Sequence, residues 1–491
     1  RDPPPDVCDA AYGIFFLQGV GQLFPWNVFI NAEDYFRRRL CGTPYEKNFE
    51  NFFSIGYNVM AVLGLGFVLR YQRRFNQRLQ VLGALSVSTL VFMMSMLLVL
   101  VVEMSGTVLF NVTMVLVNHL CSMLCQGGLF AFAGAFPPRY TQAMMLGQGL
   151  AGLSVSIAGL FTTLSGPDAT ECVSDEGFGI DLTSVKSQTE CKSYEVDISS
   201  LVYFGIACGI LLACMISFPV LERLPIPLEY TRNTTPSSLE SVLSETLEAQ
   251  SSLMKSEHGE RERGWISPIE DSRGSLHYSQ QSILEEHALD DTVVNQDKNN
   301  FRGSRGIMLQ FSGLQPLVPF AVGVFSTFAV TLALFPATTS KIMSSRQCIP
   351  GQSRFFAEDV FVMFSFVSFN LFDFIGRLVA GLPQQLLSGH MLSSMAAARV
   401  VFIPLFLACR LQGSRFPQWL HWDVFPLALM PLFSFSNGFV GSHSMMAGPH
   451  AVCPQMRDFA GTSMVFCLSM GLLVGSVLSF FTLYFSTGSF S

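Results

Sequence analysis

The chain has 491 residues and a formal net charge of −7, an acidic balance that gives no sign of a nucleic-acid partner. Hydrophobic residues make up 50% of the chain and charged residues only 13%, whereas a soluble domain carries roughly 25% charged residues. With a mean hydropathy of +0.41 and 46 phenylalanines, this composition excludes an ordinary soluble globular protein and indicates one that lies within a membrane.

Apolar runs of about 20 residues are long enough to cross a bilayer as helices. The chain contains eleven of them, which predicts an all-α polytopic membrane protein with eleven transmembrane helices. In chain order they cover residues 11–30, 52–69, 79–102, 108–132, 142–164, 199–221, 316–338, 360–382, 391–411, 424–446 and 459–484.

A long polar segment separates the first six runs from the last five. Residues 222–305 are rich in Ser, Glu, Asp and Gln and show no helical periodicity, so we expect a disordered acidic linker. The predicted organisation is therefore a six-helix bundle at 1–221, this linker at 222–305, and a five-helix bundle at 306–491.

Arginines set the predicted orientation. Arg70, Arg73, Arg74 and Arg78 crowd the loop between the second and third runs, without an acidic residue among them. Because short cytoplasmic loops are enriched in Lys and Arg, this loop, the amino terminus and the linker are expected in the cytoplasm and the carboxyl terminus outside. Three arginines at 37–39 argue against this assignment, although acidic residues lie close to them.

The twelve cysteines indicate no metal site, because none has metal-site spacing with histidine, and no cofactor is expected. In the predicted topology Cys172 and Cys191 share one outer loop, where a disulfide can form. Cys41 and Cys348 also fall outside, so the alternative pairings stay open.

The run at 360–382 contains one acidic and one basic residue, Asp373 and Arg377, and no other charge. Each costs a few kcal/mol in a membrane helix unless it is paired or faces a polar cavity. Their i,i+4 spacing places them one turn apart on one helix face, which Asn370 extends. We interpret them as part of a polar pathway, the alternative being a pair that holds the bundle in register without contacting a substrate.

Two earlier runs carry side chains that suit a heterocycle. Trp26 follows Pro25, a residue that kinks a membrane helix and is tolerated beside a cavity, and Trp26 could equally be an aromatic anchor at the membrane interface. Gln126 offers two donors and one acceptor for the edge of a base. Taken alone, however, an interhelical hydrogen bond is the favoured interpretation of Gln126.

Other polar residues in the runs favour structural roles. His119 and Gln148 are expected to pack between helices, and Arg399 is expected to extend toward the cytoplasmic membrane surface. The run at 424–446 contains Ser434, Asn437 and further polar residues, which either line a pathway or belong to close packing of small residues.

Six segments together resemble the signatures of equilibrative nucleoside transporters. Each is weak alone, but their order and spacing are specific, and the similarity extends over nearly the whole chain outside the linker. They are FPWN at 24–27, QGGLF at 126–130, GQGLAG at 147–152, NLFDFIGR at 370–377, ARVVFIPL at 398–405 and SNG at 436–438.

The resemblance implies a major-facilitator-like fold in which bundles of six and five helices enclose a central cavity. It also implies facilitated diffusion of nucleosides such as adenosine and uridine by alternating access, without a cofactor or an obligatory coupling ion. We expect a monomer, in the plasma membrane as the family default, with an endolysosomal membrane as the alternative.

Carried over by motif, the resemblance assigns one end of a substrate site to the first and fourth runs. Trp26, with Leu23 and Ile30 one turn to either side, matches the wall that packs on the nucleobase. Gln126 matches the residue that hydrogen-bonds the base, with Ser122 one turn before it. Some relatives have glycine in place of Ser122, a difference that bears on base preference or inhibitor fit.

The other end of the site falls to the second half of the chain. Asp373 and Arg377 match the pair that binds the ribose hydroxyls, with Asn370 in support. Phe335 and Leu472 match apolar contacts from the seventh and eleventh runs. A carboxylate accepts hydrogen bonds from adjacent hydroxyls while a guanidinium donates to them, so the chemistry of the pair suits a sugar.

Two other functions stay open from the residues. The first is a transporter of the same fold that couples to protons or prefers nucleobases or organic cations, since Asp373 can titrate if Arg377 swings away. The second is a receptor or scaffold without transport, whose linker recruits cytoplasmic partners. An enzyme is not expected, because the runs hold no paired carboxylates, nucleophile elbow or phosphate-binding loop.

Overall fold

The computed structural model describes residues 9–31, 36, 49–72, 74, 76–100, 107–166, 198–225, 314–347, 349, 351–382 and 386–488, apart from the side chains of 30, 31, 49–54, 107–112 and 199. Most of the predicted linker falls outside these residues, as do Cys41, Cys172, Cys191 and Cys348. The described helices all belong to one compact unit.

The first half of the chain forms a long helix at each of the six predicted positions. The helices are α1 (Ala10–Asn31), α3 (Phe49–Tyr71), α4 (Gln77–Leu100), α5 (Thr107–Gly134), α6 (Pro138–Ser165) and α7 (Ile198–Arg223). In lipid the backbone must satisfy its own hydrogen bonds, and for an apolar run of this length the helix does so. α6 begins with a proline, whose missing N–H removes no helical bond at that position, while α1 continues through Pro25.

The second half also follows the predicted runs, with one difference. Its long helices are α11 (Val318–Leu334), α12 (Glu358–Ala380), α15 (Val424–Ala447) and α16 (Arg457–Thr487). The predicted helix at 391–411 is instead divided into α13 (Gly389–Ala398), a 3₁₀ turn η7 (Arg399–Val401) and α14 (Phe402–Leu407). Two acidic residues in the first turn of α12 and Arg377 in its last turn complement the helix dipole.

Nine helices in the described part of the chain are long and apolar enough to cross a membrane. They are α4 to α7, α11, α12, the segment from α13 to α14, α15 and α16. The helices α1 and α3 lie at the other two predicted positions, and α3 holds a shorter apolar stretch at Ile55–Tyr71. The all-α membrane architecture is thus confirmed, whereas the number eleven is not.

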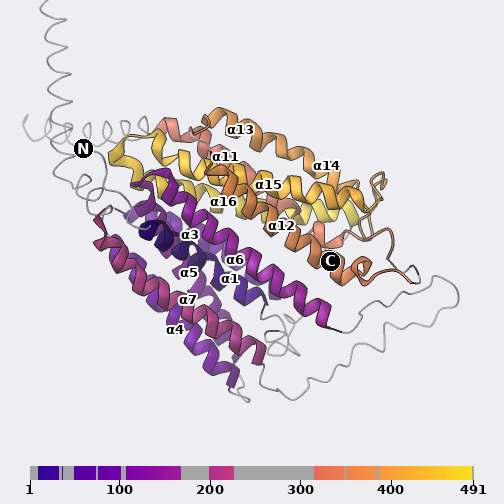
Figure 1. Ribbon diagram of the computed structural model, residues 1–491, viewed down its shortest axis with the longest axis horizontal. Coiled ribbons are helices and arrows are strands. Elements are labelled where there is room, and N and C mark those ends of the chain that lie inside the picture. The colour runs from indigo at the N-terminus through magenta and orange to yellow at the C-terminus, as the bar shows by residue number, and fades with distance from the viewer. Residues whose placement is uncertain are drawn as a thin grey trace, which may run out of the picture. The chain divides into compact units, whose positions relative to one another are not determined.

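The helix α6 is one of the helices through which the two halves of the chain meet. It packs along α1 of its own half and along α12 of the second half, and it also contacts α15. Within the second half α12 packs on α15 and α11 on α16, and α16 in turn reaches α3 and α5. In Figure 1 the helices of the first half, coloured indigo to magenta, lie beside one another. The helices of the second half, coloured orange to yellow, do the same.

Glycines allow the closest of these helix crossings. A Cβ at Gly147 would overlap the Phe16 carbonyl oxygen of α1, and a Cβ at Gly438 would overlap the Asp373 carbonyl oxygen of α12. Lipid provides no hydrophobic drive for helix association, so close backbone approach becomes a main source of attraction. Gly438 of α15 therefore lets α12 approach closely, which brings the charge pair of α12 near Asn437, the residue before Gly438.

Replacing Gly438 with alanine is expected to destabilise the protein by about 1–3 kcal/mol, because the added methyl group forces α12 and α15 apart. The matched control is Gly83→Ala on α4, where a Cβ meets nothing within 4 Å. There the helix favours alanine by about 0.5–1 kcal/mol. Thermal unfolding of the purified protein in detergent measures both variants, and equal midpoints would contradict the close approach of the two helices.

Candidate functional site

The charge pair on α12 is buried and closed on itself. Arg377 donates from Nε to Asp373 Oδ2 at 2.6 Å, and the two residues are 7% and 5% exposed. One helical turn separates them, which is the spacing at which an acidic and a basic side chain meet on a helix. Removing either partner would leave the other as an uncompensated buried charge.

Two further helices bind the pair. Asn437 of α15 donates from Nδ2 to Asp373 Oδ1 at 2.6 Å, and Arg377 donates from Nη1 to the Met145 carbonyl oxygen of α6 at 3.1 Å. A carboxylate only accepts hydrogen bonds, so the Asn437 amide must turn its NH₂ group toward Asp373. The pair therefore joins α12 to α15 in its own half and to α6 in the other half.

The face of α6 that meets α12 carries glycines at the contact points. A Cβ at Gly149 would come within 3.0 Å of Arg377 Cδ, and one at Gly152 within 2.5 Å of Asn370 Oδ1. Asn370 is half-buried and donates to the Phe366 carbonyl oxygen of its own helix at 3.0 Å. The two glycines of α6 thus make room for the polar face of α12.

Trp26 lies in an aromatic cluster formed by three helices. Its ring centroid is 4.3 Å from that of Tyr57 on α3 and 5.2 Å from that of His119 on α5, and the residue is half-buried. His119 is buried and meets both rings in T-shaped contacts, an arrangement that aromatic pairs prefer. Leu23 is half-buried in α1, and the Ile30 side chain lies outside the described part of the chain.

Gln126 and Ser122 lie one turn apart on the same face of α5, and each is 8% exposed. Their side chains make no hydrogen bond to any residue that the structure describes. The backbone beside them is held firmly, because Gly127 packs on Leu65 of α3 and its carbonyl oxygen accepts from Thr462 of α16 at 3.3 Å. Gln126 therefore presents an uncommitted amide from a well-packed helix.

The two apolar candidates of the second half lie at α11 and α16. Phe335 follows α11 and stacks on Phe369 of α12, with ring centroids 3.9 Å apart and planes 9° apart, and it meets Phe366 edge-on at 5.1 Å. Because Phe369 precedes Asn370 in α12, this stack borders the polar face of that helix. Leu472 is half-buried on α16.

The structure gathers the candidates in two groups. Asp373, Arg377 and Asn370 share one face of α12, whereas Trp26 and Gln126 lie on α1 and α5 of the first half. Among the described residues, no hydrogen bond, ion pair or ring contact connects the two groups. The helix α6 packs on both α1 and α12, which carry residues of the two groups.

Arg399 does not extend to the membrane surface, and that prediction is wrong. The residue is 2% exposed, and its guanidinium donates to the Phe433 carbonyl oxygen at 2.8 Å, to Thr331 Oγ1 at 2.6 Å and to Ser436. The 3₁₀ turn η7 interrupts the helix at this residue, and the side chain points inward to α11 and α15. The polar stretch around Ser436 was the sequence signal for this contact.

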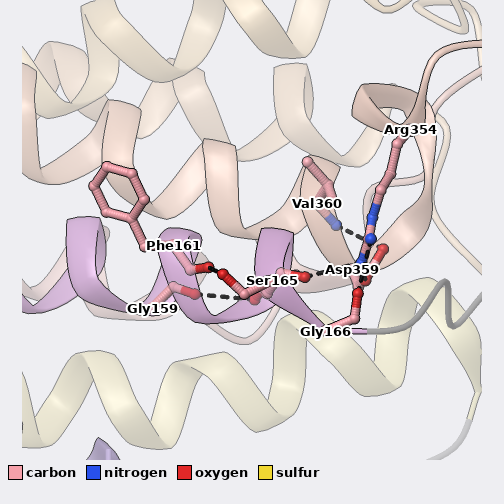
Figure 2. Close-up of polar contacts among 8 residues, drawn as sticks. Gly159, Phe161, Ser165, Gly166, Arg354, Asp359 and Val360 are labelled. Carbon is pink, nitrogen blue, oxygen red and sulfur yellow. Dashed lines mark hydrogen bonds and ion pairs between the residues drawn. The ribbon is translucent and has the colours of Figure 1, made fainter.

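A further arginine joins the two halves at one end of α6 (Figure 2). Arg354, in the 3₁₀ turn η6 (Arg354–Phe356), donates to the Gly166 carbonyl oxygen at 2.8 Å and to the Thr163 carbonyl oxygen at 2.9 Å. These oxygens lie at the carboxyl-terminal end of α6, where the helix dipole favours a cation. Asp359, 3.7 Å from the same guanidinium, offsets its charge.

At the opposite end of α6, Gln142 takes the corresponding place. Its Nε2 donates to the Leu378 carbonyl oxygen of α12 at 3.2 Å. Gly381 provides the space for that side chain, because a Cβ there would overlap the Gln142 amide. Hydrogen bonds to main-chain oxygens therefore connect α6 to the second half at both of its ends.

Comparison with known proteins shows which family this chain belongs to. The family model described as nucleoside transporter matches residues 109–484. The chain belongs to the nucleoside transporter family. Equilibrative nucleoside transporter 1 of Homo sapiens is 30% identical over 97% of this chain and 97% of its own, and transporter 2 of Homo sapiens is 28% identical over 98% of each. These relatives are transporters, not enzymes.

The fold of this chain is similar to that of solved transporter structures. The proton:xylose symporter XylE of the major facilitator superfamily, bound to 6-bromo-6-deoxy-D-glucose, matches with a TM-score of 0.57 and 11% identity. The match covers 96% of this chain and 88% of that one. FucP in its outward conformation matches with a TM-score of 0.50 and 12% identity, covering 97% and 95%. The predicted major-facilitator-like architecture is confirmed.

For this family member, Arg377→Gln is expected to cost about 3–5 kcal/mol of stability, because it leaves the Asp373 carboxylate buried without its cation. Adding Asp373→Asn should recover part of that loss, since both side chains are then neutral. Equilibrium unfolding in mixed detergent micelles, carried out on wild type, both single variants and the double variant, measures the coupling between the two residues.

The control for this cycle is Arg78→Gln. Arg78 Nε lies 3.1 Å from Glu222 Oε2, but the arginine side chain is 55% exposed. Loss of this exposed pair is expected to cost under about 1 kcal/mol. A loss of the same size at Arg377 would contradict the interpretation of a buried, coupled pair.

Proposed function

We propose that this protein carries nucleosides across a membrane, down their own gradient, by alternating access. Full-length similarity to equilibrative nucleoside transporters supports the substrate class, and the major-facilitator fold supports the mode of movement. The observation that carries the proposal is the buried pair of Asp373 and Arg377, on the helix of the second half that packs against α6 of the first. Charged residues kept inside a membrane bundle mark a path for a polar substrate.

The proposed sugar end follows from the chemistry of the substrate class. A nucleoside is neutral overall, with a flat aromatic base and a sugar that carries adjacent hydroxyl groups. In the proposal Asp373 accepts hydrogen bonds from those hydroxyls and Arg377 donates to them, with Asn370 beside the pair. A hydrogen bond to a charged group contributes about 1.5–3 kcal/mol, so a few such bonds permit binding and still allow release.

The proposed base end lies on α1 and α5. The Gln126 amide makes no hydrogen bond to a described residue, so its two donors and one acceptor are available to the edge of a base. Trp26 already packs on Tyr57, and we propose that its exposed part contacts the base, with Ser122 shaping the space beside Gln126. The apolar contacts are assigned to Leu23, Ile30, Phe335 and Leu472.

Alternating access requires the contacts along α6 to open at one end at a time. Arg354 holds the end at Gly166, and the hydrogen bond from Gln142 to the Leu378 carbonyl oxygen holds the other. With the amino terminus in the cytoplasm, the Arg354 end faces outside and the Gln142 end faces the cytoplasm. Among the described residues a small set of hydrogen bonds holds each end, and we propose that either set can break within the few kcal/mol that separate the states of a protein.

The proposal also includes a monomeric transport unit in the plasma membrane. Both halves of one chain, at 1–221 and 306–491, contribute residues to the proposed site, so a second copy is not needed to complete it. The linker at 222–305 then lies in the cytoplasm and the carboxyl terminus outside the cell.

Proteoliposomes that contain the purified protein are expected to take up labelled uridine or adenosine until the concentrations inside and outside are equal. Asp373→Asn should reduce uptake about tenfold or more, because the loss of a charge-assisted hydrogen bond corresponds to about 1.5–3 kcal/mol. Arg78→Gln should leave uptake unchanged. Absence of saturable uptake of both nucleosides would refute the proposal and favour a receptor or scaffold.

The same vesicles decide between downhill transport and proton coupling. Arg377 and Asn437 each engage one oxygen of Asp373, and protonation would weaken both hydrogen bonds. An imposed pH gradient is therefore expected to drive no accumulation of uridine above equilibrium. Accumulation that follows the pH gradient, and that Asp373→Asn abolishes, would support the proton-coupled alternative.

A further inference from the structure

Arg399 is buried among neutral partners. Its guanidinium donates to the Phe433 carbonyl oxygen, to Ser436 and to Thr331, and its Cζ lies 4.8 Å from the centroid of the Phe433 ring. Removing a charge from water costs several kcal/mol, so an opposite charge is needed to offset it. Asp373 is the carboxylate with which Arg399 interacts electrostatically, although the two are not in direct contact.

Two neutral side chains connect Arg399 to Asp373. Arg399 Nη2 donates to Thr331 Oγ1 at 2.6 Å, Thr331 Oγ1 lies 2.7 Å from Asn437 Oδ1, and Asn437 Nδ2 donates to Asp373 Oδ1 at 2.6 Å. We call these four residues the relay. They come from η7, α11, α15 and α12, and each is at least nine-tenths buried.

The residues at the two ends of the relay determine the direction in which its hydrogen bonds are donated. A guanidinium only donates and a carboxylate only accepts, so Thr331 accepts from Arg399 and Asn437 donates to Asp373. The Asn437 oxygen then faces the Thr331 hydroxyl, which can donate to it, with the Thr327 carbonyl oxygen at 2.8 Å as a second acceptor. When the Thr331 proton is directed at Asn437 Oδ1, all donors point toward Asp373, and hydrogen bonds aligned in this way strengthen one another.

We propose that Arg399 is a positioning residue that acts through the relay to fix the orientation of Asp373. It does so without contacting the nucleoside, and the inference rests on the proposed function, which assigns Asp373 to the sugar hydroxyls. Arg377 holds one carboxylate oxygen and Asn437 the other, so the carboxylate cannot rotate while both remain in place. A group already held in its bound orientation loses less conformational freedom when substrate binds.

A purely structural role for Arg399 can be separated from this proposal. Its bonds to the Phe433 carbonyl oxygen and to Ser436 hold η7 to α15 without the relay. Thr331→Val removes the hydroxyl that joins Arg399 to Asn437 and leaves those two bonds in place. If Arg399 only braces the helices, this variant should therefore bind substrate normally.

Thr327 provides a matched control on the same helix. It lies one turn before Thr331, is fully buried, and its hydroxyl donates to the Gly323 carbonyl oxygen at 2.8 Å. Thr327→Val therefore removes one buried hydroxyl from α11 without touching the relay. Thr331→Val should lose more thermal stability than Thr327→Val, because it also leaves Arg399 Nη2 without its acceptor. Uptake is therefore compared per folded transporter, so that a difference in KM between the two variants does not reflect the amount of folded protein.

Uridine uptake by Thr331→Val is expected to show a KM about 5–10-fold above wild type, with Vmax per folded transporter within about twofold. Thr327→Val should keep the wild-type KM. The analogue 2′,3′-dideoxyuridine lacks the two hydroxyls that Asp373 is proposed to bind, so its KM should be the same in all three proteins.

Arg399→Lys adds a second test, because lysine keeps the charge but lacks the planar fork that reaches two partners. In that background Thr331→Val should change the uridine KM by less than about twofold, since both residues act in one chain. Equal uridine KM in Thr331→Val and Thr327→Val would overturn the relay, as would equal increases for uridine and its dideoxy analogue. A wild-type protein without nucleoside uptake would overturn the proposed function itself, and the relay with it.

Discussion

The arrangement of the second half depends on keeping one carboxylate, Asp373, inside a membrane bundle without leaving it unpaired. An isolated buried carboxylate is costly enough that the elements around it must each supply something. Arg377 supplies the opposite charge from the same helix, Asn437 supplies a donor from α15, and glycines on α6 and α15 supply the space for close approach. The position of Asp373 therefore depends both on close helix packing and on its hydrogen-bond partners.

The hydrogen bonds around this carboxylate are distributed unevenly between the two halves of the chain. On one side α12 is held to α15 by the close approach at Gly438 and by the hydrogen bond from Asn437. On the other side Arg377 reaches only a carbonyl oxygen of α6, at Met145. That contact can break without stranding a charge, because Arg377 stays paired with Asp373. The side-chain partners of Asp373 therefore come from its own half of the chain, and Arg377 extends the pair to a main-chain oxygen of α6.

Membrane-length apolar runs predicted the helices well, because lipid leaves such a run one stable conformation. The charge pair was also predictable, since both partners lie on one helix. The environment of Arg399 was not, because its partners come from α11 and α15 and because a 3₁₀ turn leaves no trace in hydropathy. Trp26 shows the same limit, since Tyr57 and His119, whose rings it contacts, belong to two other helices.

Two arginines of the second half bind main-chain oxygens of α6. Arg377 binds the carbonyl of Met145, and Arg354 binds those of Thr163 and Gly166. A main-chain oxygen is present whatever residue occupies the position, so a change of side chain at Met145 or Thr163 leaves the acceptor unchanged. These contacts therefore require the two arginines and, at Arg377, the small residue Gly149 beside it, but no particular side chain at positions 145 and 163.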